Sequence, residues 1–263
     1  MSFRLQIIGG GNMGEALLRG LLKNNWSSED QLHVVEPVSE RRDYLATTIP
    51  GISVSEEPLS ELDSLIAVKP DKVSEALEVL SKLNPPRVLS IAAGVKVSSM
   101  EKILGENVRV LRAMPNTPAL IGKGSAGVAA GSSAIDEDLI WAVEILSAVG
   151  SAMVVEESQL DAVTGLSGSG PAYLFFLAEA LIDAGSEVGL SKDEAKSLVE
   201  QTLLGAAALL YESDDPAEVL RQKVTSKGGT TAAAIEVFEN ASFREIIRAA
   251  VFAATERSLQ LGD

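Results

Sequence analysis

The stretch FRLQIIGGGNMG, residues 3–14, joins an apolar run to a glycine-rich turn, and it decides the fold of the N-terminal half. Its glycines include the G-x-G-x-x-G spacing. The first glycine of that pattern can adopt the backbone angles of a tight turn, the second lets the main chain approach a pyrophosphate, and the third lets a helix and a strand pack closely. We therefore predict a dinucleotide-binding turn. The residues expected to line it are Gly9, Gly11, Asn12, Met13 and Gly14.

The segments on both sides of the turn complete this pattern. Phe3–Ile8 is predicted to form a strand. Met13–Lys23 is predicted to form a helix whose leucines make a buried stripe and whose positive N-terminal end faces the phosphates. The next predicted strand, Leu32–Glu36, ends in an acid. A glycine-rich turn that binds nothing is the alternative, and the order of strand, turn, helix and acid argues against it.

Glu36 bears on the choice of cofactor. It lies 22 positions after Gly14, where a carboxylate accepts hydrogen bonds from an adenosine ribose and repels a 2′-phosphate, which locally favours NADH. Arg41 and Arg42 would offset this repulsion if they folded back, but we expect them on a solvated helix face. The sequence therefore leaves both NADP(H) and NAD(H) open as cofactors.

Composition and charge limit the classes of function. The 263 residues are 46% apolar and 22% charged, which is ordinary for a globular protein. The net charge of −15 comes without a basic block, so nucleic acid and anionic membrane surfaces are not expected partners. The chain enters a strand without a leader, and its apolar stretches are too short to span a bilayer. We therefore expect a cytoplasmic protein.

The chain has no cysteine and a single histidine. Disulfides, thiolate metal sites and thiol nucleophiles are thereby excluded. His33 falls in a predicted central strand, where packing under a helix is a more natural role than catalysis. The acids show no paired spacing typical of metal ligands, so no metal site is expected.

The chain divides into two parts by its pattern of elements. In residues 1–157, β-branched runs alternate with amphipathic helices, which predicts an α/β Rossmann domain with a doubly wound parallel sheet. The predicted strands are Phe3–Ile8, Leu32–Glu36, Ile52–Val54, Asp63–Val68, Val88–Ala92, Arg109–Ala113, Ala126–Ala130 and Ala152–Val155. Residues 158–263 are predicted to be all helical. The predicted helices are Gly170–Gly189, Ser191–Glu212, Pro216–Val224, Thr231–Asn240 and Ser242–Leu261.

Two further features come from the helical segments. Capping boxes are predicted where a serine precedes a glutamate by three positions. These pairs are Ser98 with Glu101, Ser191 with Glu194, and Ser242 with Glu245. The C-terminal helices carry alanine and leucine on more than one face, which suggests burial against a second copy of the chain and predicts at least a homodimer.

Three segments that follow predicted strands are candidates for the nicotinamide end of the cofactor site. In doubly wound sheets, ligands lie outside the carboxyl ends of the strands. Small residues there would let a nicotinamide ring lie flat, while Lys69 and Asn116 offer hydrogen-bond donors. The cofactor-binding residues predicted on this basis are Val68, Lys69, Pro70, Ala93, Gly94, Pro115 and Asn116. Loops of turn-forming residues are an equally good interpretation of each segment taken alone.

The segment VTSKGGTT, residues 224–231, is a candidate anion site. Two glycines, several hydroxyls and the start of a predicted helix together make a nest of N–H donors suited to a small carboxylate or phosphate. A helix cap formed by Thr230 or Thr231 is the simpler alternative. Capping does not require both glycines, so anion binding is favoured.

A second glycine cluster, Gly165–Pro171, opens the first long C-terminal helix. The β-hydroxyacid dehydrogenases have a comparable cluster followed one helical turn later by a catalytic lysine. Leu174 occupies that position here. Alcohol dehydrogenation of that type would therefore lack its acid.

These motifs together resemble the pyrroline-5-carboxylate reductase family. The resemblance spans nearly the whole chain in the right order, and its two C-terminal motifs are highly specific. The matching segments are Gly9–Ala16, Ala67–Pro70, Met114–Pro118, Asp161–Tyr173 and Thr225–Thr231.

The resemblance implies a function and an assembly. It implies an NAD(P)-dependent oxidoreductase that transfers a hydride to the C=N carbon of 1-pyrroline-5-carboxylate and yields L-proline, the last step of proline biosynthesis. It also implies an all-α dimerisation domain that interlocks with a partner subunit, with decamers of five dimers common. The substrate would lie on Ser226, Gly228, Gly229, Thr230 and Thr231. Thr231 would be the catalytic residue, with its hydroxyl facing the imine nitrogen.

The chemistry fits this assignment, although two alternatives stay open. A protonated imine is already electrophilic, so the site needs alignment and a modest donor for nitrogen, with no metal and no histidine. A threonine hydroxyl is too weak an acid to give up its proton unaided, so Thr231 is expected to orient the substrate. The alternatives are a related imine or 3-hydroxyacid reductase acting on another small carboxylate, and a non-enzymatic binder that uses the dinucleotide as a redox signal.

Overall fold

The computed structural model describes residues 3–262. They form two compact units, one of residues 3–169 with 253–262 and one of residues 170–252. The boundary predicted from the sequence, between residues 157 and 158, follows the end of the last strand, and it stays a prediction.

The first unit is built on one eight-stranded sheet with the order β3-β2-β1-β4-β5-β6-β7-β8. Every predicted strand is present, with ends that differ by a few residues. The strands are β1 (Leu5–Ile8), β2 (Leu32–Val35), β3 (Ser53–Ser55), β4 (Ser64–Ile66), β5 (Arg87–Ser90), β6 (Arg109–Met114), β7 (Gly124–Ala130) and β8 (Gly150–Val154). The order reverses beside β1 and β4, and this switch point is where a doubly wound sheet binds its ligand.

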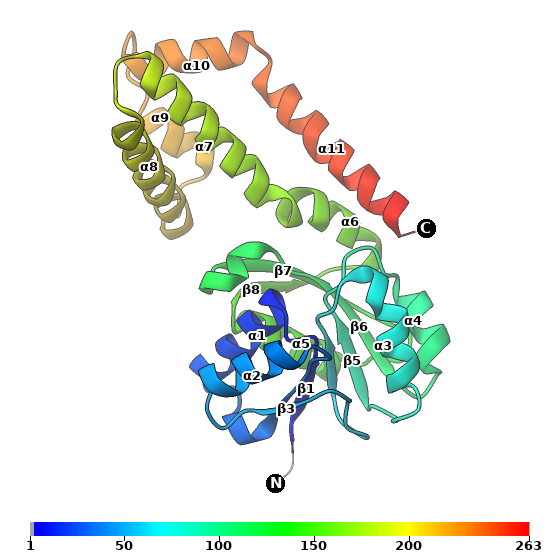
Figure 1. The fold of residues 1–263 in the computed structure, drawn as a ribbon. Coiled ribbons are helices and arrows are strands. Elements are labelled where there is room, and N and C mark those ends of the chain that lie inside the picture. The colour runs from blue at the N-terminus through cyan, green and yellow to red at the C-terminus, as the bar shows by residue number, and fades with distance from the viewer. Residues whose placement is uncertain (1–2, 263) are drawn as a thin grey trace. The chain divides into compact units, whose positions relative to one another are not determined.

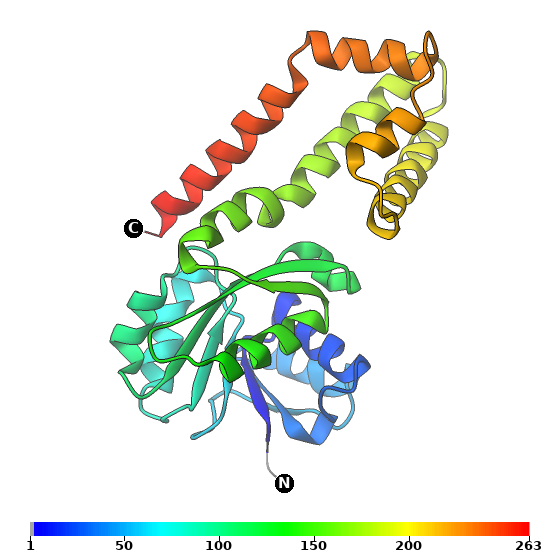
Figure 2. The ribbon, with the colours of Figure 1, turned by 180° about the vertical axis from the view of Figure 1, so that it is seen from behind.

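Helices cover both faces of this sheet (Figure 1). Leu5 and Ile7 of β1 face the core shared with α1, α2 and α5, whereas Ile8 faces the core shared with α3 and α4. This alternation follows from the two-residue period of a strand. Figure 2 shows the sheet from behind, with α5 lying against it. The helices are α1 (Asn12–Lys23), α2 (Ser39–Thr48), α3 (Val73–Leu80), α4 (Val97–Leu104), α5 (Asp136–Ser147) and α6 (Leu160–Val163).

The sheet is not entirely parallel, which corrects the sequence prediction. β7 runs antiparallel to β6, with Ala113 opposite Val128, while the other pairings are parallel. Only a short 3-10 turn, Thr117–Ile121, connects the two strands. A parallel pair needs a crossover of a dozen or more residues, so this connection forces the chain to turn back.

The second unit is helical, as predicted. Its helices are α7 (Gly170–Glu187), α8 (Lys192–Glu212), α9 (Ala217–Lys223), α10 (Thr230–Asn240) and most of α11 (Phe243–Leu261). α7 and α8 lie side by side (Figure 1; Figure 2). The last turns of α11 belong to the first unit, where Ser258 donates a hydrogen bond of 2.6 Å to Asp161. Among residues 3–262, none of the helices has both the length and the apolar character needed to cross a bilayer.

One of the three predicted capping boxes forms. Ser191 and Glu194 bond reciprocally at the start of α8. The prediction for Ser98 is wrong, because α4 begins at Val97 and Glu101 instead accepts hydrogen bonds from the backbone and hydroxyl of Ser132. The prediction for Ser242 is also wrong: Glu245 pairs with Arg248 one turn along α11.

The single histidine is a buried strand residue. His33 in β2 is 2% exposed, and its two ring nitrogens lie 2.9 and 2.8 Å from the hydroxyls of Ser53 and Ser55 in β3. Burial lowers the pKa of His33 below its usual range. The side chain therefore links two strands as a neutral group.

Candidate active site

The glycine-rich turn between β1 and α1 has the geometry that its spacing predicts. Gly9 has a φ of +105°, and its N–H donates to the carbonyl of Val35 at 2.8 Å. A Cβ atom on Gly14 would lie 2.0 Å from the carbonyl oxygen of Gly9. A Cβ atom on Gly11 would meet no atom within 4 Å. Two of the glycines are thus required by the protein's own packing, whereas the third faces open space on the ligand side.

The start of α1 fits a pyrophosphate. Gly11 is the N-cap of α1, and it has no side chain to accept a hydrogen bond from the first turn. The N–H groups of Asn12, Met13 and Gly14 are the donors that an α-helix leaves unpaired at this end. An anion would satisfy them and would also be favoured by the helix dipole. The turn therefore suits the dinucleotide that the sequence predicts.

Glu36 lies against this turn. The residue is 8% exposed, and its carboxylate accepts hydrogen bonds from the N–H groups of Gly10 at 2.9 Å and Val38 at 3.0 Å. A Cβ atom on Gly10 would lie 2.7 Å from Leu45 Cδ1 and 3.2 Å from Glu36 Oε2. Gly10 is therefore a further required glycine, which the G-x-G-x-x-G spacing does not include. The run of three consecutive glycines is the signal that could have found it.

The two arginines after Glu36 fold back, which corrects the expectation of a solvated helix face. Arg41 donates from Nε to the carbonyl of Gly10 at 2.6 Å and forms an ion pair with Glu15. Arg42 donates to the carbonyls of Glu36 and Pro37 at 2.7 and 2.8 Å. These partners are far along the chain or on the main chain, so no helical periodicity reveals them.

Glu15 is held between two arginines. It pairs with Arg41 from α2 and with Arg19, one turn along α1, at 2.7 Å. Burial alone would raise the pKa of Glu15, but the hydrogen bonds and charges of these arginines outweigh it and lower that pKa. The carboxylate thus stays ionised and fixes Arg41 beside the glycine-rich turn.

The remaining predicted cofactor residues follow β4, β5 and β6, which are neighbours in the sheet. A Val68 methyl group lies 3.0 Å from the position of a Cβ atom on Gly9, so it borders the turn. Lys69 and Pro70 are exposed, Ala93 and Gly94 are half-buried, and Pro115 is buried. The structure therefore brings these segments to one edge of the sheet.

The side chain of Asn116 forms hydrogen bonds within the protein that its sequence context does not predict. Its amide nitrogen donates to the carbonyl and the hydroxyl of Ser167 at 3.1 and 3.2 Å, and its amide oxygen accepts from the N–H of Ser125 at 2.9 Å. Ser167 belongs to a π-helical turn, Thr164–Gly168, and such turns are frequent at functional sites. We propose that Asn116 ties this turn to β7 rather than donating to the cofactor.

Replacing Asn116 with alanine is expected to lower the free energy of unfolding by about 1 to 3 kcal/mol, because three hydrogen bonds are lost at a half-buried site. Urea denaturation measures this change. The control is Asn107→Ala at an exposed turn, for which a change within about 0.5 kcal/mol is expected. Unchanged stability together with weaker cofactor binding would instead support the role in cofactor binding predicted from the sequence.

The predicted anion site begins α10 in the helical unit. Its N-cap is Gly229, which has no capping side chain, and Thr230 and Thr231 occupy the first two helical positions. The simpler interpretation, in which a threonine caps the helix, is therefore wrong. Gly228 has a φ of +72°, and Gly229 donates to the carbonyl of Ser226 at 3.0 Å. This tight loop leaves the first-turn N–H groups of α10 for an anion.

Two family models match the chain. Residues 157–261 match the family described as pyrroline-5-carboxylate reductase dimerisation. Residues 4–94 match the family described as NADP oxidoreductase coenzyme F420-dependent. The two matches fall on the helical C-terminal part and on the glycine-rich turn with its strands.

Curated relatives match over the full length. The pyrroline-5-carboxylate reductase of Synechocystis is 41% identical over 100% of this chain and 99% of that protein. The enzyme of Arabidopsis thaliana is 39% identical over 99% of this chain and 96% of that protein.

Solved structures of the same family are similar to this chain in fold and in sequence. A pyrroline-5-carboxylate reductase from Coxiella burnetii has a TM-score of 0.93 at 34% identity and 100% coverage of both chains. The Plasmodium falciparum enzyme with NADP bound has a TM-score of 0.85 at 30% identity, covering 99% of this chain and 98% of that chain.

Proposed function

The chain belongs to the pyrroline-5-carboxylate reductase family, and from this premise we propose how its residues reduce 1-pyrroline-5-carboxylate to L-proline with NAD(P)H. One structural observation carries the proposal for the substrate. α10 begins at a glycine N-cap, so the N–H groups of its first turn are available for the substrate carboxylate.

The residues of the first unit would hold the dinucleotide. The start of α1 would bind the pyrophosphate, Glu36 would accept hydrogen bonds from the adenosine ribose, and Val68 would border the bound cofactor. When bound, the reduced nicotinamide supplies the hydride for the reaction. The protein's contribution is to orient both partners and to keep them in place.

The residues of α10 would hold the substrate. The carboxylate of the ring would lie on the N–H groups of Thr230 and Thr231 and on the hydroxyl of Ser226. The Thr231 hydroxyl would then donate a hydrogen bond to the neutral imine nitrogen, or accept one from the N–H of the protonated nitrogen. When the carbon of the C=N bond gains the hydride while nitrogen carries the proton, the π electrons pass to nitrogen and a secondary amine results. Thr231 orients the ring for this step and does not itself have to give up a proton.

The assay that tests the function follows the oxidation of NADH and NADPH by the purified chain, with and without 1-pyrroline-5-carboxylate. Oxidation that depends on this substrate is the expected result. A chain that binds the dinucleotide but oxidises neither form with this substrate would contradict the proposal. Oxidation of the cofactor with only another small ring imine, or reduction of NAD(P)+ by a 3-hydroxyacid, would favour the related reductases.

We further propose that the helical unit forms a homodimer, with decamers of five dimers as a larger assembly. Within the described residues, helices α7–α10 bury a single side chain, Ala195. Many of their large apolar side chains are exposed, among them Leu174, Phe176, Leu198, Leu204 and Val237. Apolar surface on this scale indicates an interaction site.

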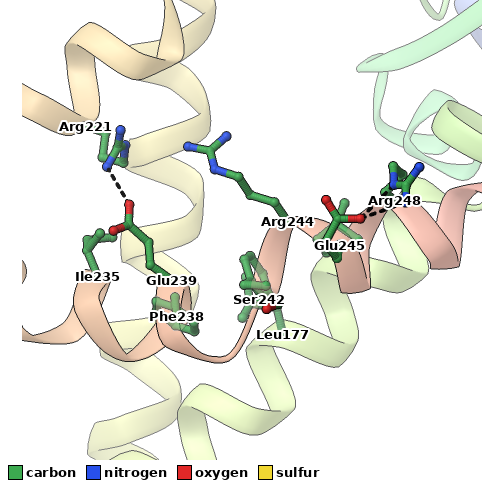
Figure 3. A pocket seen from close by; sticks show the side chains of 11 residues that line it. Leu177, Arg221, Ile235, Phe238, Glu239, Ser242, Arg244, Glu245 and Arg248 are labelled. Atoms are coloured by element: carbon green, nitrogen blue, oxygen red, sulfur yellow. Dashed lines mark hydrogen bonds and ion pairs between the residues drawn. The ribbon is translucent and has the colours of Figure 1, made fainter.

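An open cavity of about 860 Å³ in the helical unit supports this assembly. Figure 3 shows Leu177, Ile235 and Phe238 beside it, and the ion pairs Arg221–Glu239 and Arg248–Glu245 are also among the residues that line it. A cavity lined by apolar side chains together with charged pairs resembles one half of a subunit interface. Light scattering should give a mass of at least twice 27.6 kDa for the purified chain.

A further inference from the structure

The carboxylate of Glu36 is fixed in one position at the end of β2. Each of its oxygens accepts a backbone N–H, from Gly10 at 2.9 Å and from Val38 at 3.0 Å, and the residue is 8% exposed. Moving the carboxylate away would leave these donors unpaired in a buried place, at a cost in free energy. A negative charge is therefore held against the turn that binds the dinucleotide.

This charge lies where the two forms of the cofactor differ. In a doubly wound sheet, an acid at the end of the second strand accepts hydrogen bonds from the adenosine ribose of NAD. NADP carries a 2′-phosphate on that ribose, and two negative charges at contact distance in a partly buried site repel each other. Glu36 therefore favours the cofactor without the phosphate.

Arg41 is positioned by three contacts that leave it little freedom to neutralise such a phosphate. Its Nε–H donates to the carbonyl of Gly10 at 2.6 Å, and its terminal nitrogen pairs with Glu15. Its guanidinium also lies 4.7 Å from the centre of the Tyr44 ring. A move toward a 2′-phosphate would break the pair with Glu15, which is only partly exposed.

Arg42 is held mainly by the backbone. One of its terminal nitrogens donates to the carbonyls of Glu36 and Pro37 at 2.7 and 2.8 Å. The other lies 3.5 Å from the carboxylate of Glu56. Both arginines that could counter the charge of Glu36 thus already form hydrogen bonds and ion pairs within the protein.

Resting on the function proposed above, we propose that Glu36 makes this chain prefer NADH over NADPH. The preference follows from a fixed carboxylate at the ribose position and from two nearby arginines that are already paired with other groups of the protein.

Isothermal titration of the full chain with NADH and with NADPH, without substrate, tests this inference through binding alone. The dissociation constant for NADPH is expected to be at least about tenfold higher than that for NADH. Glu36→Gln removes the charge at nearly constant size and should reduce this ratio about tenfold, mainly through tighter binding of NADPH. Glu36→Ser, which also removes the bulk, is the second variant in case the first does not fold.

The control is Glu78→Gln, which makes the same change in net charge at an exposed position of α3 and should leave the ratio unchanged. NADPH binding as tight as NADH binding in the unmodified chain would overturn the inference. A ratio that neither folded Glu36 variant alters would also overturn it, with circular dichroism establishing that the variants fold. Failure of both nucleotides to bind is a different result, because it would contradict the proposed function itself.

Discussion

Replacing Thr231 with alanine is expected to lower kcat by about a hundredfold while leaving the dissociation constant of the cofactor within about twofold. The lost hydroxyl is the group proposed to orient the imine nitrogen. The helix itself should persist, because its N-cap is Gly229 and alanine is a strong helix former. Steady-state kinetics with 1-pyrroline-5-carboxylate and a cofactor titration measure the two quantities separately.

Thr231→Ser is the matched control, because it keeps the hydroxyl and removes one methyl group. It should retain most of the activity. Equal losses of turnover and cofactor affinity in Thr231→Ala would show that the threonine supports the fold of the site rather than orienting the substrate. Full activity in that variant would remove Thr231 from the reaction altogether.

Alanine substitutions at two glycines of the same turn are expected to affect different properties, the stability of the fold in one case and the affinity for the cofactor in the other. Gly14→Ala should lower the free energy of unfolding by about 3 kcal/mol or more, because its Cβ would lie 2.0 Å from the carbonyl oxygen of Gly9. Gly11→Ala should change this free energy of unfolding by less than about 1 kcal/mol. The φ of −67° at Gly11 suits alanine, and the added Cβ atom would meet no atom within 4 Å.

The cofactor affinity of Gly11→Ala should nevertheless fall about 10- to 100-fold. The new methyl group would stand between the start of α1 and the pyrophosphate, and would weaken charge-assisted hydrogen bonds. Chemical denaturation and calorimetric titration of both variants measure the two effects. A stable Gly14→Ala protein, or a Gly11→Ala protein with normal cofactor affinity, would contradict the roles assigned to these glycines.

Much of the site could be predicted because its parts are local in sequence. The turn at Gly9–Gly14 requires only a strand, a tight turn and a helix in order, and the start of α10 requires only a glycine-rich loop before a helix. Both have the predicted local structure. The strands and the long C-terminal helices likewise follow from periodicities of two and 3.6 residues. Short elements such as α6 and the π-helical turn were missed, because they are too brief for periodicity to reveal.

Residue types and their spacing are enough to predict that a Rossmann sheet precedes a helical part, and that the helical part has apolar surface to bury against another chain. They also determine the positions of Glu36 and Thr231 relative to their motifs. These properties depend on residue type and on spacing along the chain, so they can be read without knowing which distant segments meet.

Which polar groups pair, in contrast, depends on how distant segments come together in the fold. Arg41 reaches Glu15, Asn116 holds Ser167, and Glu101 accepts from Ser132 across gaps of many residues. The antiparallel direction of β7 was settled in the same way, by the short connection from β6. A side chain with several possible partners takes the one that the fold brings within hydrogen-bond distance, and that distance is set by the packing of whole elements rather than by local sequence.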